Sequence, residues 1–193
     1  MSEVSLRARK KAATMHRVQE IAVGMFEDRG FDDVTVEQVA AAADVSPSTI
    51  YRYFGTKEGL ALHDEHDDAM YGALADLLAT HDVWTAADLA LAALEQPHFV
   101  QDGELTLRRT RLWATEPSLR VATVSVVNDL VDQLAPQIAA SPKNDYSPEQ
   151  ARVLTTAVLW AAVSAIEGWY AGDRSTTMGE HLRAMIALLR PDR

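Results

Sequence analysis

Residues 35–57, TVEQVAAAADVSPSTIYRYFGTK, decide the fold of this chain. Thr35 stands three residues before Gln38, which is the spacing of a capping box, where each side chain bonds the other residue's backbone N–H. Ser46 followed by Pro47 marks a second helix start, because Ser accepts free N–H groups and Pro needs no partner at the first helical position. The stretch therefore predicts two short helices joined by a tight turn.

The second of these helices, over residues 47–54, is polar on most of its surface, with Ile50 and Phe54 expected to pack inward. Two short helices with a polar second helix are typical of a helix-turn-helix, whose second helix enters the major groove of DNA. Hydroxyl, guanidinium and ammonium groups suit that place because they bond base edges and phosphates. The residues expected to form the DNA interface are Thr35, Ser46, Pro47, Ser48, Thr49, Tyr51, Arg52, Tyr53 and Lys57.

Three motifs lie in register within residues 10–62: FEDRGF at 26–31, TVEQVA at 35–40 and VSPSTIYRYFGTKE at 45–58. Together they resemble the DNA-binding domain of the TetR family of transcriptional regulators. Asp44 departs from the pattern, because the family more often has Gly there, but Asp also tolerates turn dihedrals. The resemblance implies a dimeric repressor that binds an operator in double-stranded DNA. A small-molecule effector would release it by tilting the helix that begins near Lys57 and changing the separation of the recognition helices.

The composition fits a folded intracellular regulator and argues against other classes of protein. The chain has 193 residues, of which 48% are hydrophobic and 24% charged, as in ordinary folded proteins. It has no cysteine, which excludes disulfides and thiolate metal sites. No apolar run follows the basic residues near position 10, so no secretory signal is expected and a cytoplasmic location is predicted.

The net charge of −10 is unusual for a DNA-binding protein, but the acid is unevenly distributed. Residues 1–60 hold eight basic and nine acidic residues, whereas residues 61–193 hold ten basic and nineteen acidic ones. Residues 1–11 are interpreted as a basic arm that follows DNA, with a solvated, disordered terminus as the alternative. The acidic body would make DNA affinity strongly dependent on salt.

The apolar periodicity predicts an all-α chain. The resemblance implies an N-terminal three-helix bundle with the helix-turn-helix over residues 1–56 and a helical ligand-binding and dimerisation domain over 57–193. The expected helices cover residues 9–29, the segment after Thr35, 47–54, 57–79, 86–95 with Thr85 as its cap, 103–115, 117–139, 148–171 and the segment from Thr177 to just before Pro191. Capping-box spacing recurs at Ser147 and at Thr177.

The two last helices predict a partner subunit. Residues 153–166 contain no charged residue, and fourteen residues are too few to span a bilayer, so a helix buried on nearly all sides is expected. One small domain cannot bury both this helix and the apolar final helix. A homodimer without membrane contact is the simple solution, and the resemblance implies a four-helix interface between subunits.

Residues 108–111 hold three arginines, Arg108, Arg109 and Arg111, that would meet a carboxylate or phosphate of an effector. Pairing with the chain's surplus of acidic residues is the alternative. Trp113 and Trp160 would line a mostly apolar pocket, or else belong to the core. Residues 107–120 resemble a subgroup of the family that includes the mycofactocin regulator, which implies an apolar or acyl-CoA-like effector.

Two other functions are kept as alternatives. His63, His66 and Asp67 would share a helical face and make the chain a metal sensor, but a charged, solvated linker helix is the simpler explanation, and no metal or cofactor is expected. A small helical enzyme is the second alternative, but the sequence has no phosphate loop, nucleophile elbow or zinc-protease motif. The chain is therefore predicted not to be an enzyme.

Overall fold

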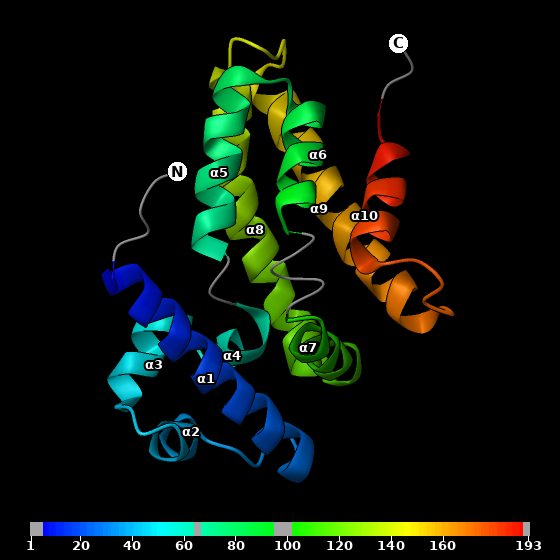
Figure 1. Ribbon diagram of the computed structural model, residues 1–193. Coiled ribbons are helices and arrows are strands. Elements are labelled where there is room, and N and C mark those ends of the chain that lie inside the picture. Colours follow the sequence, from blue (N-terminus) through cyan, green and yellow to red (C-terminus); the bar gives the residue numbers. More distant parts are fainter. Residues whose placement is uncertain (1–5, 64–66, 95–101, 191–193) are drawn as a thin grey trace. The chain divides into compact units, whose positions relative to one another are not determined.

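The computed structural model describes residues 6–63, 67–94 and 102–190, and within these ranges it contains helices and no strand (Figure 1), which confirms the all-α prediction. The helices are α1 (Leu6–Arg29), α2 (Val36–Ala42), α3 (Pro47–Phe54), α4 (Gly59–Leu62), α5 (Asp67–Thr80), α6 (Val83–Leu94), α7 (Gly103–Thr115), α8 (Pro117–Ala140), α9 (Pro148–Ala171) and α10 (Met178–Ala187).

The chain forms two compact units, and neither is continuous in sequence. The N-terminal unit consists of Met1–Ala69 and Leu107–Ala122, and the C-terminal unit of Met70–Thr106 and Thr123–Arg193. The N-terminal unit thus contains the helix-turn-helix together with the end of α7 and the start of α8. The functional boundary after residue 56 stays a prediction.

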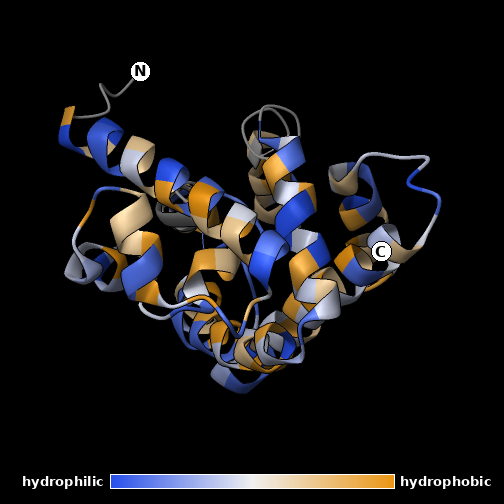
Figure 2. Cartoon of the chain, turned by 90° about the horizontal axis from the view of Figure 1, so that it is seen from below, coloured by the Kyte–Doolittle hydropathy of each residue, from blue (hydrophilic) through white to orange (hydrophobic). Residues whose placement is uncertain are grey.

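The N-terminal unit is organised around α1, which contacts both α2 and α4. Hydrophilic and hydrophobic residues alternate along this helix, the one that follows the N label in Figure 2. Val18 and Ala22 are fully buried, and Phe26 packs against Phe31 with ring centroids 4.8 Å apart. Burying this stripe at helical spacing contributes to the driving force for the bundle, together with the buried residues of α2, α3 and α4.

The helix starts predicted from capping boxes are confirmed. Thr35 accepts from the backbone N–H of Gln38 at 3.3 Å, and the Gln38 side chain accepts from the N–H of Thr35 at 3.1 Å. Ser147 and Thr177 form equivalent capping boxes at the starts of α9 and α10. The cap of α3 belongs to the candidate nucleic-acid interface and is described below.

The single helix expected over residues 57–79 is interrupted, so that prediction is wrong. α4 ends at Leu62, and His63 is extended, with φ −105° and ψ 152°. Gln19 of α1, only 1% exposed, explains the break: its Nε2 donates to the carbonyl of Leu60 at 2.9 Å and also to that of His63. The buried amide takes carbonyls that a continuing helix would bond to its own N–H groups.

The start of α6 also differs from the prediction. Asp82, not Thr85, caps this helix, since one carboxylate oxygen accepts from the backbone N–H groups of Trp84 and Thr85 at 3.1 and 3.2 Å. The Thr85 hydroxyl donates to the other oxygen at 2.7 Å. Hydrogen bonds from the hydroxyl and N–H of Thr85 lower the pKa of the Asp82 carboxyl. The Asp82 carboxyl is therefore charged at neutral pH. The cap lies three residues earlier in the chain than the predicted cap, Thr85.

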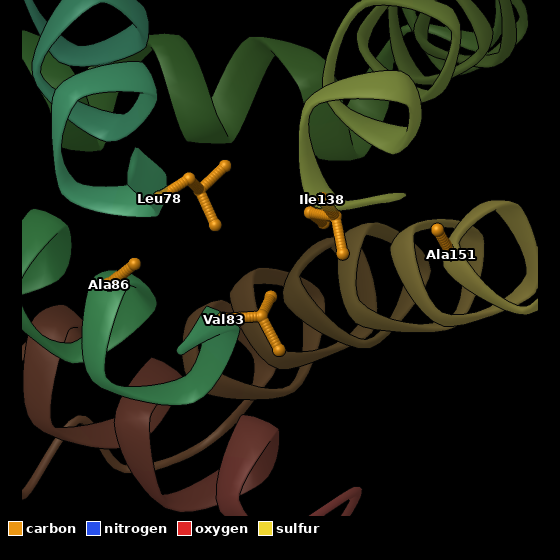
Figure 3. Packing of buried hydrophobic residues seen from close by; sticks show 5 residues of the cluster. All are labelled: Leu78, Val83, Ala86, Ile138 and Ala151. Carbon is orange, nitrogen blue, oxygen red and sulfur yellow. The ribbon is translucent and has the colours of Figure 1, made fainter. Parts of the chain in front are cut away.

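The C-terminal unit has two apolar clusters. In the first, Leu78, Val83, Ala86, Ile138 and Ala151 come from α5, α6, α8 and α9 and lie around one shared interior (Figure 3). A buried hydrogen bond from the Ser141 hydroxyl to the Leu78 carbonyl joins the end of α8 to α5. The second cluster, built on Ala165, Met178 and Leu182, joins α9 to α10.

α9 is apolar but poorly covered within this chain. Its buried residues are Ala151, Thr155 and Ala165, whereas Val153 is 66% exposed and Trp160 is 37% exposed. The prediction of a helix buried on nearly all sides is therefore wrong for the single chain. By length and composition alone α9 could also cross a membrane. This is weak evidence for a membrane span, because core and interface helices share that composition.

Gln19→Leu tests what ends α4. The substitution keeps a side chain of similar size but leaves two carbonyls without their donor, so the free energy of unfolding should fall by about 1–3 kcal/mol. Urea unfolding followed by circular dichroism measures this. Glu20→Leu, at the exposed neighbouring position on α1, is the matched control and should change stability by less than about 0.5 kcal/mol. Equal midpoints for the two variants would contradict the role given to the amide.

Candidate nucleic-acid interface

The start of α3 is a cluster of hydroxyl groups. The Ser46 oxygen caps the helix by accepting from the N–H of Thr49 at 3.2 Å. The same oxygen lies 2.8 Å from the Ser48 hydroxyl and 3.0 Å from the Thr49 hydroxyl. Pro47 and Ser48 are exposed at this helix end, where hydroxyls and the helix dipole suit phosphate or base-edge contacts.

The turn before α3 fixes where this cluster points. Asp44 has φ 51°, in the left-handed region, and the N–H of Val45 bonds the carbonyl of Ala40 at 3.0 Å. Ala43 and Ile50 on either side are fully buried, so the turn is anchored from both helices. The sequence-based expectation that Asp44 makes this turn is confirmed.

The outer face of α3 carries aromatic and basic side chains. Tyr51 is 49% exposed and Arg52 is exposed, while Tyr53 is half-buried. The Arg52 guanidinium lies over the Tyr53 ring, 4.8 Å from its centroid, and the Lys11 ammonium of α1 lies over the same ring at 5.9 Å. Ile50 and Phe54 are buried, as predicted from the helical spacing.

Lys57 and Thr35 flank this face within the same unit. The Lys57 ammonium lies 4.3 Å from the centroid of the Phe31 ring and donates to the carbonyl of Asp32 at 3.4 Å. Thr35 is exposed and its oxygen accepts in the α2 cap, which leaves its own O–H able to donate outward. The structure therefore brings all nine predicted DNA-contact residues into the same unit, on α3 and the segments that flank α2 and α3.

The basic N-terminal segment is helical where it is described. α1 begins at Leu6, three residues earlier than predicted, and Arg7, Arg9 and Lys10 are exposed on its first turns. Residues 1–5 of the predicted arm lie outside the described residues. Sequence reasoning assigned Lys11 to that arm and had no means of predicting that it lies over the Tyr53 ring.

The predicted effector residues have local partners. Within the N-terminal unit Arg108 forms an ion pair with Glu27, and Arg109 donates to the carbonyl of Ala61 at 2.9 Å. Arg111 is exposed. Trp113 is 9% exposed with the Arg120 guanidinium 5.5 Å from its ring centroid, and Trp160 belongs to the C-terminal unit.

The residues of the metal-sensor alternative do not form the expected helical face. His63 is extended and follows the end of α4, while Asp67 begins α5. His66 lies outside the described residues. Within the part of the chain that the structure describes, no three His, Asp or Glu side chains gather as a metal site would require.

Two family models match the chain. Residues 20–63 match the bacterial regulatory proteins of the tetR family, and residues 81–193 match the MftR C-terminal domain. A Mycobacterium tuberculosis protein named for regulating mycofactocin biosynthesis, MftR, is 23% identical over 184 residues, covering 91% of this chain and 89% of its own. The transcriptional regulator TcmR of Streptomyces glaucescens is 35% identical over 102 residues, covering 52% of this chain and 44% of its own.

Solved structures agree on the fold. FadR of Thermus thermophilus, a TetR-family repressor solved with lauroyl-CoA, has a TM-score of 0.55 at 18% identity, over 91% of this chain and 92% of its own. NalD of Pseudomonas aeruginosa, the secondary repressor of an efflux pump, has a TM-score of 0.55 at 16% identity, over 92% of this chain and 96% of its own.

These relatives are transcriptional regulators, which confirms the prediction that the chain is not an enzyme. The motifs of residues 26–58 carry the first family match, and the helices from α6 onward carry the second. The chain belongs to the TetR family of bacterial transcriptional regulators and has a C-terminal region of the MftR type.

Proposed function

We propose that this protein is a homodimeric repressor that binds a near-palindromic operator through α3 and leaves it when a small molecule binds the C-terminal helices. The observation that carries the proposal is the exposed polar face of α3, with hydroxyls at its start and Tyr51 and Arg52 further along. An α-helix presented in this way fits the major groove, N-terminal end first.

The functional groups of the side chains on and beside α3 indicate which part of the DNA each would contact. Arg52 is the candidate for a bidentate contact to guanine, because guanidinium matches the two acceptors that guanine presents in the major groove. Ser48 and Thr49 would contact base edges or phosphates at the helix start. Tyr51 and Lys57 would hold the phosphate backbone, which positions the helix without reading sequence.

A stripe on α9 supports the dimer. Val153, Ala157, Trp160 and Ser164 recur every three or four residues, so they lie on one side of the helix, and Val153 and Trp160 are exposed there. α10 adds the exposed Leu188 just after its end, at 77% exposure. A second copy related by a two-fold axis would cover this mixture of small and large side chains.

A partner subunit explains the apolar character of α9 more simply than a membrane does. The DNA target of the proposed function lies in the cytoplasm, and burying α9 between subunits needs no lipid. Cytoplasmic location without membrane contact is thus part of the proposal.

For the effector we propose an acyl-CoA-like molecule, meaning an apolar chain joined to an anionic group. FadR of Thermus thermophilus, which shares the fold, was solved with lauroyl-CoA. Arg111 is exposed and suits an anionic group, whereas Arg108 would first have to leave its ion pair with Glu27. Trp113, in the same unit as Arg111, is the proposed contact for the apolar part, whereas Trp160 lies on the α9 stripe assigned to the dimer.

Substitutions on α3 and at Lys57 test DNA reading. On a site enriched from random-sequence DNA, Tyr51→Ala and Lys57→Ala should weaken binding to all DNA, each by about 3- to 10-fold, because each variant lacks a group that holds phosphate. Arg52→Ala should cost about 1–3 kcal/mol on the enriched site and relax its sequence preference. Fluorescence anisotropy at several salt concentrations measures both effects. Lys143→Ala, at an exposed position of the C-terminal unit, is the charge-matched control. Wild-type binding by all three variants would rule out this docking.

Ala157→Glu tests the dimer. A carboxylate in the centre of the α9 stripe should separate the subunits, because burying an unpaired charge is strongly unfavourable. Light scattering coupled to size exclusion should give the mass of one 21.2 kDa chain for the variant and twice that for the wild type. Gln133→Glu, an exposed position of α8 that gains the same negative charge, should stay dimeric. A monomeric wild type, or a dimeric Ala157→Glu, would contradict the interface.

Lauroyl-CoA tests the effector class. At saturation it should weaken operator binding by about 5- to 150-fold, the range of ordinary allosteric coupling, whereas coenzyme A alone and laurate alone should not. Competition in the anisotropy assay measures the release. Arg111→Ala should raise the lauroyl-CoA concentration needed. Release by none of a series of short and long acyl-CoA thioesters would exclude this class while leaving the DNA-binding function intact.

A further inference from the structure

Three cations of the proposed DNA-reading region lie over aromatic rings. Arg52 and Lys11 lie over the Tyr53 ring, at 4.8 and 5.9 Å from its centroid. Lys57 lies 4.3 Å from the centroid of Phe31 and donates to a backbone carbonyl. Within the described ranges, no carboxylate pairs with Arg52 or with Lys57.

Three arginines elsewhere in the described residues pair with carboxylates, although Arg120 lies over the Trp113 ring and Arg190 also lies over the Trp84 ring. Arg108 pairs with Glu27 in the N-terminal unit, while Arg152 pairs with Asp132 and Arg190 with Asp88 in the C-terminal unit. A carboxylate holds a cation in place but cancels its charge. An aromatic ring also holds the cation, through the negative face of its quadrupole, and leaves the net charge at +1.

This difference matters because the protein is acidic overall, with a net charge of −10. DNA affinity depends on how many phosphates are neutralised by protein cations, and each such contact releases counterions from the DNA. A basic side chain that is free to rotate must be ordered on binding, which costs conformational entropy. A ring-held cation is already ordered and still carries its charge.

We propose that Tyr53 is a positioning residue for DNA binding, whose ring rather than its hydroxyl holds Arg52 and Lys11 ready for the DNA. This inference rests on the proposed function and deepens it. Tyr53 joins a cation of the recognition helix to one of α1, so a single ring orders the two helices' basic groups together. Phe31 acts in the same way on Lys57, but it is only 2% exposed and belongs to the core. Tyr53 is half-buried and is the position to test.

The experiment compares Tyr53→Leu with Tyr53→Phe on the enriched DNA site. Leu removes the ring, and binding should weaken by roughly 5- to 20-fold, which corresponds to removing two cation–ring interactions. The slope of log affinity against log salt should become shallower by about one for each phosphate that the protein no longer neutralises. Phe keeps the ring and should restore most of the affinity and of the slope. Tyr51 is the contrasting position, because no cation lies over its ring among the described residues. Tyr51→Phe and Tyr51→Leu should weaken DNA binding equally, because the Tyr51 hydroxyl makes the contact.

A double-mutant cycle separates positioning from simple loss of structure. Once Arg52 is replaced by Ala, Tyr53→Leu should cost clearly less than it does in the wild type, because one of the two held cations is gone. Thermal unfolding of each variant checks that the fold is kept. Equal cost in both backgrounds would overturn the assignment of Arg52 to the ring.

An NMR measurement on the free protein, without DNA, tests the ring geometry independently of the proposed DNA-binding function. In NMR spectra of the free protein, the side-chain signals of Arg52 and Lys11 should be shifted upfield by the ring current, in the wild type and in Tyr53→Phe but not in Tyr53→Leu. Absence of that shift in the wild type would overturn the geometry. A normal shift with no binding to any enriched DNA would instead contradict the proposed function. If Phe weakens binding as much as Leu does, the hydroxyl carries the effect and the positioning role is wrong.

Discussion

The proposed DNA-reading surface depends on one backbone constraint, the turn between α2 and α3. Asp44 adopts φ 51°, a conformation that costs free energy for a residue with a Cβ atom. The turn cannot relax, because Ala43 before it and Ile50 after it are fully buried. Packing therefore maintains a strained turn, and the consequence is a recognition helix whose polar side faces away from the core and whose Ser46 cap is accessible.

The second theme is how an acidic chain presents positive charge. Arg108 is neutralised by Glu27, and this ion pair ties α7 to α1. Arg52 and Lys57 are held by aromatic rings, and Lys57 also by a carbonyl, which order them without cancelling their charge. These side chains are therefore ordered and still positively charged, so a protein with a net charge of −10 can keep a locally basic surface.

The helix boundaries show where local patterns succeed and fail. Caps formed by residues three apart, at Thr35, Ser147 and Thr177, were predictable because donor and acceptor lie within one helical turn. The end of α4 was not, because its partner is Gln19, more than forty positions earlier in the chain. No spacing rule links the two, and the one available signal was a polar residue within the apolar stripe of α1.

The sequence by itself determined the helical fold, the starts of the helices capped by Thr35, Ser46, Ser147 and Thr177, and the choice of the nine residues proposed for DNA reading, since these depend on short-range spacing. Only the tertiary structure decided that Tyr53 lies beneath cations of two helices, that Arg108 meets Glu27, and that α9 keeps an uncovered side. Most of these contacts join positions far apart in the chain. Their geometry comes from packing of whole helices, which a pattern along one helix does not contain.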